Sequence, residues 1–470
     1  MSTRREFLIT TLGAGFAFAG IPLKLRPIDP PAPYGPVPSP RQLAWHQLEF
    51  YGFLHFTVNT FTNREWGDGD ESSVVFNPTD FDAGQIVESA RDGGMKGLIL
   101  TCKHHDGFCL WPSRYTEHSV KNSPFRRDVV KEISDACARQ GLRFGIYLSP
   151  WDRNHPAYGR PEYLVYYRNQ LRELLNGYGP IFEIFFDGAN GGDGYYGGAY
   201  ERRQIDNRTY YDWPNTWQMV RDLQPDAVLF SDAGPDIRWV GNENGIAGET
   251  CWATSNREDF APGSADVTRL NRGDRPGTHW VPAECDVSIR PGWFYHEHED
   301  GQVKRPEQLV DLYYASVGRG ASFLLNLPPD RRGKIAQADP HAPPGVRRGL
   351  HAPLPAGFAA GAPAQSRAPR GRGRRPALSG GEGRGGGEGP AWTTNDGVST
   401  PTLVVDLGRD VSFNVVRLRE HLPLGQRVEA VALDRWAGNG WVEFARATSI
   451  GSCRLIRGPR VTSSRVRLRV

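Results

Sequence analysis

The feature that most constrains the fold is a regular alternation of short apolar segments and amphipathic segments between residues 45 and 335. The apolar segments are continuous rather than alternating with polar residues, which is typical of parallel strands covered on both faces. The predicted strands are residues 52–56, 97–102, 144–148, 181–186, 228–230, 280–284 and 322–327, and the predicted helices are residues 82–93, 128–139, 161–175, 217–223 and 306–317.

Repeated strand and helix units over roughly 290 residues predict an α/β fold, a (β/α)8-type barrel rather than an open sheet. No GxGxxG or P-loop motif follows the first strand, which argues against a nucleotide-binding sheet. From residue 392 to 470 the pattern changes to alternating apolar and polar residues, as in the stretch 402–407. This part predicts a β-sandwich domain.

Three segments lie outside these two domains. Residues 1–20 place Arg4-Arg5 before an apolar run from Ile9 to Gly20, which is typical of a bacterial twin-arginine export signal and predicts a periplasmic or secreted protein. Residues 21–44 are a Pro-rich arm. Residues 336–391 are a low-complexity segment of Pro, Gly and Arg, for which we expect either disorder or a slip of the reading frame.

Two classes of partner find no support in the sequence. No segment reaches the about 18 uninterrupted apolar residues of a membrane-spanning helix. Basic residues and aromatic residues are not interleaved, so a nucleic-acid partner is not expected either.

Polar residues follow one predicted strand after another. They are His55 and Glu65-Trp66 after the first, Lys103-His104-His105-Asp106 after the second, Ser149, Trp151 and Asp152 after the third, Asp187 after the fourth, and Asp232 and Glu243 after the fifth. The C-terminal ends of barrel strands form the active sites of such folds. The chain also has 13 Trp, 17 Tyr and 22 Phe, whose faces can stack on sugar rings or fill a core.

The chemistry is best explained by paired carboxylates. No CxxC, HExxH or GxSxG motif occurs, so we expect no metal, no cofactor and no serine nucleophile. Glycoside cleavage needs one carboxylate near the anomeric carbon and one acid near the leaving oxygen. Asp187 follows an apolar strand and precedes Gly188, which suits the first role, although an Asp in such a turn is also a common cap.

Seven motifs, in order over about 300 residues, together resemble glycoside hydrolase family 29, the α-L-fucosidases. They are Gly52-Phe-Leu-His-Phe56, Glu65-Trp66-Gly67, Lys103-His-His-Asp-Gly-Phe108, Gly145-Ile-Tyr-Leu-Ser149, Phe185-Phe-Asp-Gly188, Gly234-Pro-Asp-Ile-Arg-Trp-Val-Gly-Asn-Glu243 and Arg290-Pro-Gly-Trp-Phe-Tyr295. The resemblance implies a retaining enzyme that acts on a fucosylated oligosaccharide or glycoconjugate.

The resemblance also implies roles for individual residues. It makes Asp187 the nucleophile, and it implies that His55, Glu65, Trp66, His104 and His105 hold the fucose hydroxyls. Trp293 resembles an aromatic residue beside the methyl group of the sugar. The acid/base is Glu243 by its Gly-Asn-Glu context, with Glu249 and Glu284 as rivals.

Two further stretches of sequence suggest finer assignments. The context of Glu243, Arg238-Trp-Val-Gly-Asn-Glu243, resembles the branch selective for α-1,3/1,4-linked fucose. The segment that begins Trp392-Thr-Thr-Asn-Asp-Gly397 resembles part of a discoidin-like module. The alternative functions are a non-catalytic sugar-binding protein and a barrel hydrolase of another sugar.

Overall fold

The structure is a computed structural model that describes residues 32–189, 195–196, 201–263, 266–336, 364–367, 392, 394 and 397–470. One compact unit contains residues 31–375 and 394–470. The predicted export signal, the first part of the Pro-rich arm and most of the low-complexity segment lie outside the described residues. Within the described residues, no helix combines the length and the apolar character that a bilayer crossing requires.

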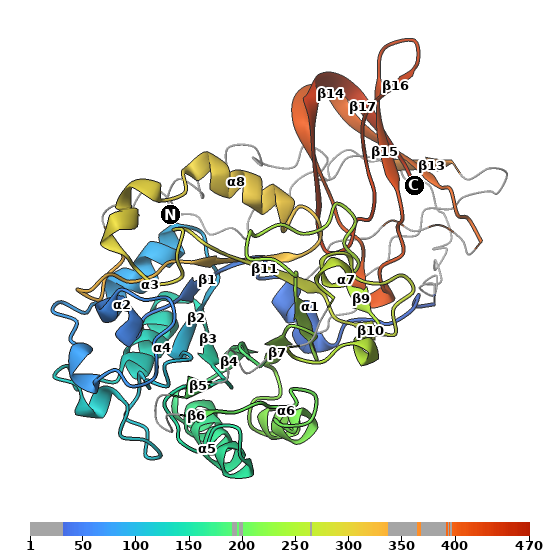
Figure 1. The fold of residues 1–470 in the computed structure, drawn as a ribbon. Coiled ribbons are helices and arrows are strands. Elements are labelled where there is room, and N and C mark those ends of the chain that lie inside the picture. Colours follow the sequence, from blue (N-terminus) through green and yellow to red (C-terminus); the bar gives the residue numbers. More distant parts are fainter. Residues whose placement is uncertain are drawn as a thin grey trace, which may run out of the picture. The chain divides into compact units, whose positions relative to one another are not determined.

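Eight parallel strands close into a barrel, which confirms the predicted (β/α)8-type architecture (Figure 1). Around the barrel the order is β1, β12, β11, β8, β7, β4, β3 and β2. The strands are β1 (Phe50–Leu54), β2 (Gly97–Lys103), β3 (Arg143–Leu148), β4 (Ile181–Phe185), β7 (Val228–Ser231), β8 (Ile237–Trp239), β11 (Ala283–Ser288) and β12 (Ser322–Asn326).

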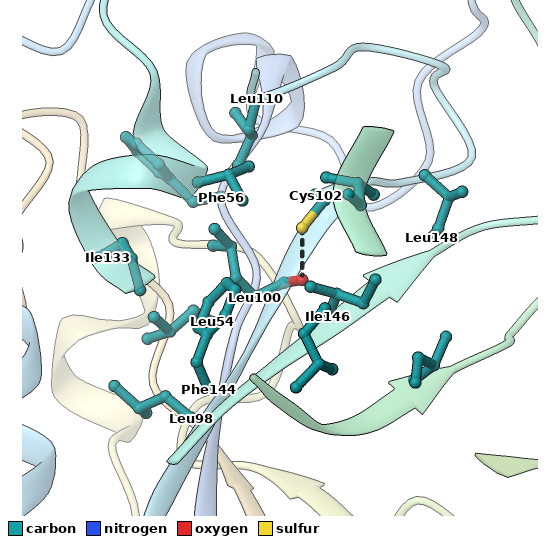
Figure 2. Packing of buried hydrophobic residues seen from close by; sticks show 14 of the residues in the cluster. Leu54, Phe56, Leu98, Leu100, Cys102, Leu110, Ile133, Phe144, Ile146 and Leu148 are labelled. Atoms are coloured by element: carbon teal, nitrogen blue, oxygen red, sulfur yellow. Dashed lines mark hydrogen bonds between the residues drawn. The ribbon is translucent and has the colours of Figure 1, made fainter. Parts of the chain in front are cut away.

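Helices cover the outside of the barrel. They are α3 (Ala83–Asp92), α4 (Val129–Gln140), α5 (Pro161–Gly177), α6 (Trp213–Leu223) and α8 (Pro306–Ala315). In α4, the Asp128 side chain caps the first turn by accepting from the Lys131 N–H, and Gly141 ends the helix with a φ of 76°, a conformation that glycine adopts without strain. The buried face of α4 includes Ile133, which belongs to the same core cluster as apolar residues of β2 and β3 (Figure 2).

The barrel departs from the predicted pattern at β8. The sequence pattern predicts no strand at residues 237–239, because this strand is short and contains Arg238. The structure buries the Arg238 guanidinium, which donates to the carbonyl oxygens of Leu270 at 2.8 Å and Trp252 at 2.9 Å. These hydrogen bonds satisfy a charge that would otherwise exclude the residue from a core strand. The predicted strand at 280–284 is also displaced, since β11 runs from Ala283 to Ser288.

Shorter elements complete the barrel domain. They are α1 (Pro40–His46), α2 (Val58–Thr62), α7 (Val267–Arg272), the two-stranded pairs β5 (Tyr195–Tyr196) with β6 (Glu201–Arg202) and β9 (Thr254–Ser255) with β10 (His279–Trp280), and the 3₁₀ turns η1 (Ser73–Val75), η2 (Val120–Asn122), η3 (Arg257–Asp259) and η4 (Glu297–Gln302). The predicted boundary between arm and barrel at residues 44 and 45 falls inside α1.

The alternating pattern predicts a β-sandwich, and the C-terminal region forms an antiparallel β-sheet. Its order is β13 (Ala364–Arg367), β14 (Thr402–Leu418), β17 (Arg454–Arg469), β15 (Val431–Trp436) and β16 (Trp441–Ala447), with the short turn η5 (Leu422–Leu424) after β14. Val431, Leu433, Ile450 and Ile456 form its buried core. The resemblance to a discoidin-like module stays a prediction.

Candidate active site

A pocket of about 250 Å³ opens where several barrel strands end. Its lining contains aromatic rings, three histidines and four acids: Phe53, His55, Trp66, His104, His105, Trp151, Phe185, Asp187, Gly188, Phe230, Asp232, Trp239, Glu243, Asp286 and Trp293. Among the described residues that line the pocket, none is Lys or Arg. Aromatic walls with a few polar groups are typical of a site for a small ligand with hydroxyl groups.

Five of the six residues predicted to bind substrate line this pocket: His55, Trp66, His104, His105 and Trp293. Trp66 leaves 58% of its surface exposed, and its ring meets Trp151 edge to face at 5.5 Å between centroids. The exposed ring of Trp66 is therefore available for stacking on a sugar.

Glu65 is not among the pocket-lining residues. Its carboxylate accepts from the backbone N–H of Trp293 at 2.7 Å and lies 2.6 Å from Nε2 of His296. These bonds lower the pKa of Glu65, the His296 bond first, against the opposing effect of burial. Glu65 thus holds the segment that carries Trp293, and its own contact with substrate stays a prediction.

The tandem pair His104 and His105 shows why both residues can face one pocket. In a continuing strand they would point to opposite faces, but β2 ends at Lys103. Nδ1 of His105 lies 2.7 Å from the Ser149 hydroxyl. Burial lowers the pKa of His105 to about 3 and that of His104 well below its usual range.

His55 is a third neutral imidazole in the pocket. Burial lowers its pKa to about 4, and its Nδ1 lies 3.0 Å from Oδ1 of Asn326. A neutral imidazole offers one donor and one acceptor. The three histidines can therefore bind sugar hydroxyls without bringing positive charge to the pocket.

Asp187 follows β4 directly. The Tyr147 hydroxyl donates to its Oδ2 at 3.1 Å, and the Gly188 N–H donates to its Oδ1 at 2.6 Å. Gly188 has a φ of 79°, and a Cβ at this position would meet the His105 ring at 2.7 Å, so the turn requires glycine. Burial, followed by the charge of Asp232, raises the pKa of Asp187 to about 7. The side chain still keeps 46% of its surface accessible, so a ligand can reach it.

The structure places the three candidate proton donors in three different environments. Glu243 lines the pocket with Asp187, and its Oε2 accepts from the Trp293 indole N–H at 3.1 Å. Glu249 instead forms ion pairs with Arg319 at 3.0 Å and with Arg454. Glu284 is fully buried inside the barrel, hydrogen-bonded to Tyr51. Only Glu243 of these three shares a pocket with Asp187.

Asp286 is a pocket residue that the sequence analysis did not single out. Its Oδ1 accepts from the Trp239 indole N–H at 2.9 Å, and burial raises its pKa well above the usual range. Asp286 is absent from the predicted site because the predicted strand ends at residue 284, two residues before it. A strand continued to Ser288 would have placed Asp286 at a strand end.

Among the described residues, the one cluster with the geometry of a metal site is Asp68, Asp70 and Glu71, which lies outside the pocket lining. Glu71 uses its two carboxylate oxygens to accept the backbone N–H groups of Asp68 at 2.6 Å and Gly69 at 2.9 Å. The cluster is therefore explained as a cap of its own loop.

The barrel and its acid-lined pocket define a glycoside hydrolase by class. A family model described as Alpha-L-fucosidase matches residues 37–342, and the chain belongs to this family. Alpha-L-fucosidase 1 of Arabidopsis thaliana is 41% identical over 447 residues, which cover 93% of this chain and 84% of that protein.

Solved structures agree with this assignment. A glycoside hydrolase 29 family member from an unknown rumen bacterium has a TM-score of 0.81 at 42% identity, covering 93% of this chain and 74% of that one. A Ruminococcus gnavus family 29 fucosidase in complex with fucose has a TM-score of 0.80 at 29% identity, covering 94% and 93%. The chain is thus an α-L-fucosidase.

Proposed function

We propose that this enzyme removes terminal α-L-fucose with retention of configuration, using Asp187 as nucleophile and Glu243 as acid and base. The observation that carries the proposal is the pocket itself. It brings Asp187 and Glu243 together and leaves Glu249 and Glu284 in other places.

In the first step, ionised Asp187 attacks the anomeric carbon while protonated Glu243 donates its proton to the leaving oxygen. In the second step, Glu243, now a carboxylate, takes a proton from water as the water attacks the fucosyl ester and releases Asp187. The Tyr147 and Gly188 donors fix the Asp187 carboxylate before attack. In this proposal the neutral histidines and Trp66 hold the sugar, and the support is that all of them line the same pocket.

Removal of each acid in turn tests these assignments. Glu243→Ala should lose hydrolysis of a natural glycan by about 10²–10⁴-fold. It should lose far less on an aryl α-L-fucoside with a good leaving group, and azide should restore its rate by giving fucosyl azide. Glu249→Ala is the matched control, because Glu249 lies outside the pocket. Azide rescue at residue 249 or 284 but not at residue 243 would overturn the assignment.

We propose, as the finer specificity, that the natural linkage is α-1,3 or α-1,4, as in Lewis-type glycans. The support is the Arg238-to-Glu243 sequence context, whose Trp239 and Glu243 both line the pocket. Trisaccharides that carry α-1,2-, α-1,3-, α-1,4- or α-1,6-linked fucose give the test. The α-1,3 and α-1,4 isomers should show the highest kcat/KM, and equal rates on all four would contradict the proposal.

We also propose that the enzyme is exported through its first 20 residues. The support is the Arg4-Arg5 pair before an apolar run. Replacement of both arginines by lysine should retain the protein in the cytoplasm of a bacterial host, whereas Arg26→Lys, outside the motif, should not.

A further inference from the structure

The pocket contains a carboxylate, Asp232, that the two-carboxylate mechanism does not use. Asp187 and Asp232 occupy equivalent places on neighbouring parallel strands, because Phe185 of β4 pairs in register with Phe230 of β7 and each acid comes two residues later. The rings of this register pair stack with centroids 3.8 Å apart. Both acids line the pocket just beyond the stacked rings.

The Asp232 carboxylate is held by backbone hydrogen bonds from Gly263 and from its own residue. Its Oδ2 accepts the backbone N–H of Gly263 at 2.8 Å. Ala233 N–H and Gly234 N–H serve the Ser231 side chain and carbonyl instead. No described Lys or Arg lines the pocket to neutralise Asp232.

We propose that Asp232 is a positioning residue that acts through Asp187, keeping the nucleophile basic and adding negative charge where the sugar becomes cationic. The transition state of glycoside cleavage resembles an oxocarbenium ion. A fixed carboxylate near the anomeric carbon stabilises that charge more than it stabilises the neutral substrate. The proposal rests on the proposed role of Asp187 as nucleophile.

The groups that face Asp187 come from its own turn and from four other strands. Tyr147 of β3 and the Gly188 N–H donate to it, and His105, which follows β2, has its Nε2 3.8 Å from Oδ2 of Asp187. Asp232, which follows β7, and Glu243, which follows β8, act on it by charge, and Asp232 has the larger effect. Because His105 is neutral, Asp232 is the strongest charged influence on Asp187.

The decisive variant is Asp232→Asn. The amide oxygen can still accept from Gly263, so this change removes the charge and keeps the hydrogen bond. The pH dependence of kcat/KM reports groups of the free enzyme. We expect the midpoint of its acidic limb to move down by about 0.5–1 pH unit, and kcat on an aryl α-L-fucoside to fall about tenfold.

Three further measurements separate this role from a structural one. Asp232→Ser, smaller and uncharged, should move the limb in the same direction. Asp286→Asn removes another pocket acid that is not among the main influences on Asp187, so the limb should keep its position whatever happens to kcat. An unshifted limb in both folded Asp232 variants, confirmed by melting temperature, would overturn the proposal and leave Asp232 a loop anchor.

The proposal and the assignment of the nucleophile fail in different ways. Restoration of Asp187→Gly activity by azide with inverted configuration tests the nucleophile alone. If that rescue succeeds and the Asp232→Asn limb stays at the wild-type pH, only the inference about Asp232 is lost. If the rescue fails, the assignment of Asp187 as nucleophile is refuted, and the inference about Asp232 is refuted with it.

Discussion

Two successive layers of side chains inside the barrel contain carboxyl groups. One layer is open to the pocket, and the other is closed to solvent. Side chains alternate along a strand with period two, so β11 directs Glu284 to one layer and Asp286 to the next, as β4 does with Glu183 and Phe185. The layer that contains Phe185 and Asp286, here called the outer layer, lines the pocket. The layer that contains Glu183 and Glu284, here called the sealed layer, is completely buried.

The sealed layer is a hydrogen-bonded network below the pocket. The Trp45 indole N–H donates to Oε2 of Glu183 at 3.1 Å, and the Tyr51 hydroxyl bonds to Glu284 and lies 3.1 Å from the Ser322 hydroxyl. Burial raises the pKa of Glu183 to about 8, and burial together with the charge of Glu183 raises the pKa of Glu284 well above its usual range. A raised pKa alone therefore does not identify a catalytic acid, because solvent and substrate must also reach the carboxyl group.

The largest expected difference between the layers is in catalysis. Asp187→Gly should reduce kcat by about 10⁴-fold or more, because the attacking group is removed. Glu284→Gln, in the sealed layer, should retain hydrolysis. Initial rates on an aryl α-L-fucoside measure both. Full activity in folded Asp187→Gly would refute its role.

The next effect is the pH dependence of the pocket. Because the pKa of Asp187 is raised to about 7 and only its ionised form attacks, kcat/KM should fall about tenfold per pH unit below that value. Stopped assays from pH 5 to pH 8 give the profile. An acidic limb centred near pH 4 would contradict the raised pKa.

The sealed layer should respond to pH through stability instead. A carboxyl group whose pKa is raised in the folded state binds more protons there than in the unfolded chain. Stability therefore falls as pH rises from about 4.5 to about 8, by about 1.4 kcal/mol per pH unit for one proton. Glu183→Gln removes this titration, so its unfolding free energy should decline less between these pH values.

Chemical denaturation at pH 5, 6.5 and 8 measures that slope. Exposed Glu307→Gln in α8 is the control and should match the wild type. Equal slopes for Glu183→Gln and the wild type would show that Glu183 itself does not gain a proton on folding.

The smallest effects concern one indole in each layer. Trp293→Phe removes the N–H donor to Glu243 and keeps an aromatic ring, so kcat should change about three- to tenfold with little change in melting temperature. Trp45→Phe removes the donor to Glu183 and should cost about 1 kcal/mol of stability with little change in kcat. The reverse pattern would contradict the division between the layers.

Strand periodicity and motif order were sufficient to predict the barrel and most of the pocket. Apolar strands such as β2 and β4 are read directly because their burial is nearly continuous. β8 was missed, since hydrogen bonds to backbone oxygens distant in sequence are what permit Arg238 in a strand. The same limit applied to Glu284 and Glu249, whose separation from Asp187 depends on tertiary contacts that no local pattern reveals.

The charge of the pocket lining affects which glycans the enzyme binds and hydrolyses. Asp187 and Asp232 add negative charge to the pocket when they ionise, and no described Lys or Arg in the lining offsets that charge. A sulfate or carboxylate on a sugar next to fucose carries the same sign of charge and is repelled over a Debye length of about 8 Å at physiological ionic strength. We therefore expect higher kcat/KM on neutral glycans than on anionic ones, and added salt should narrow that difference.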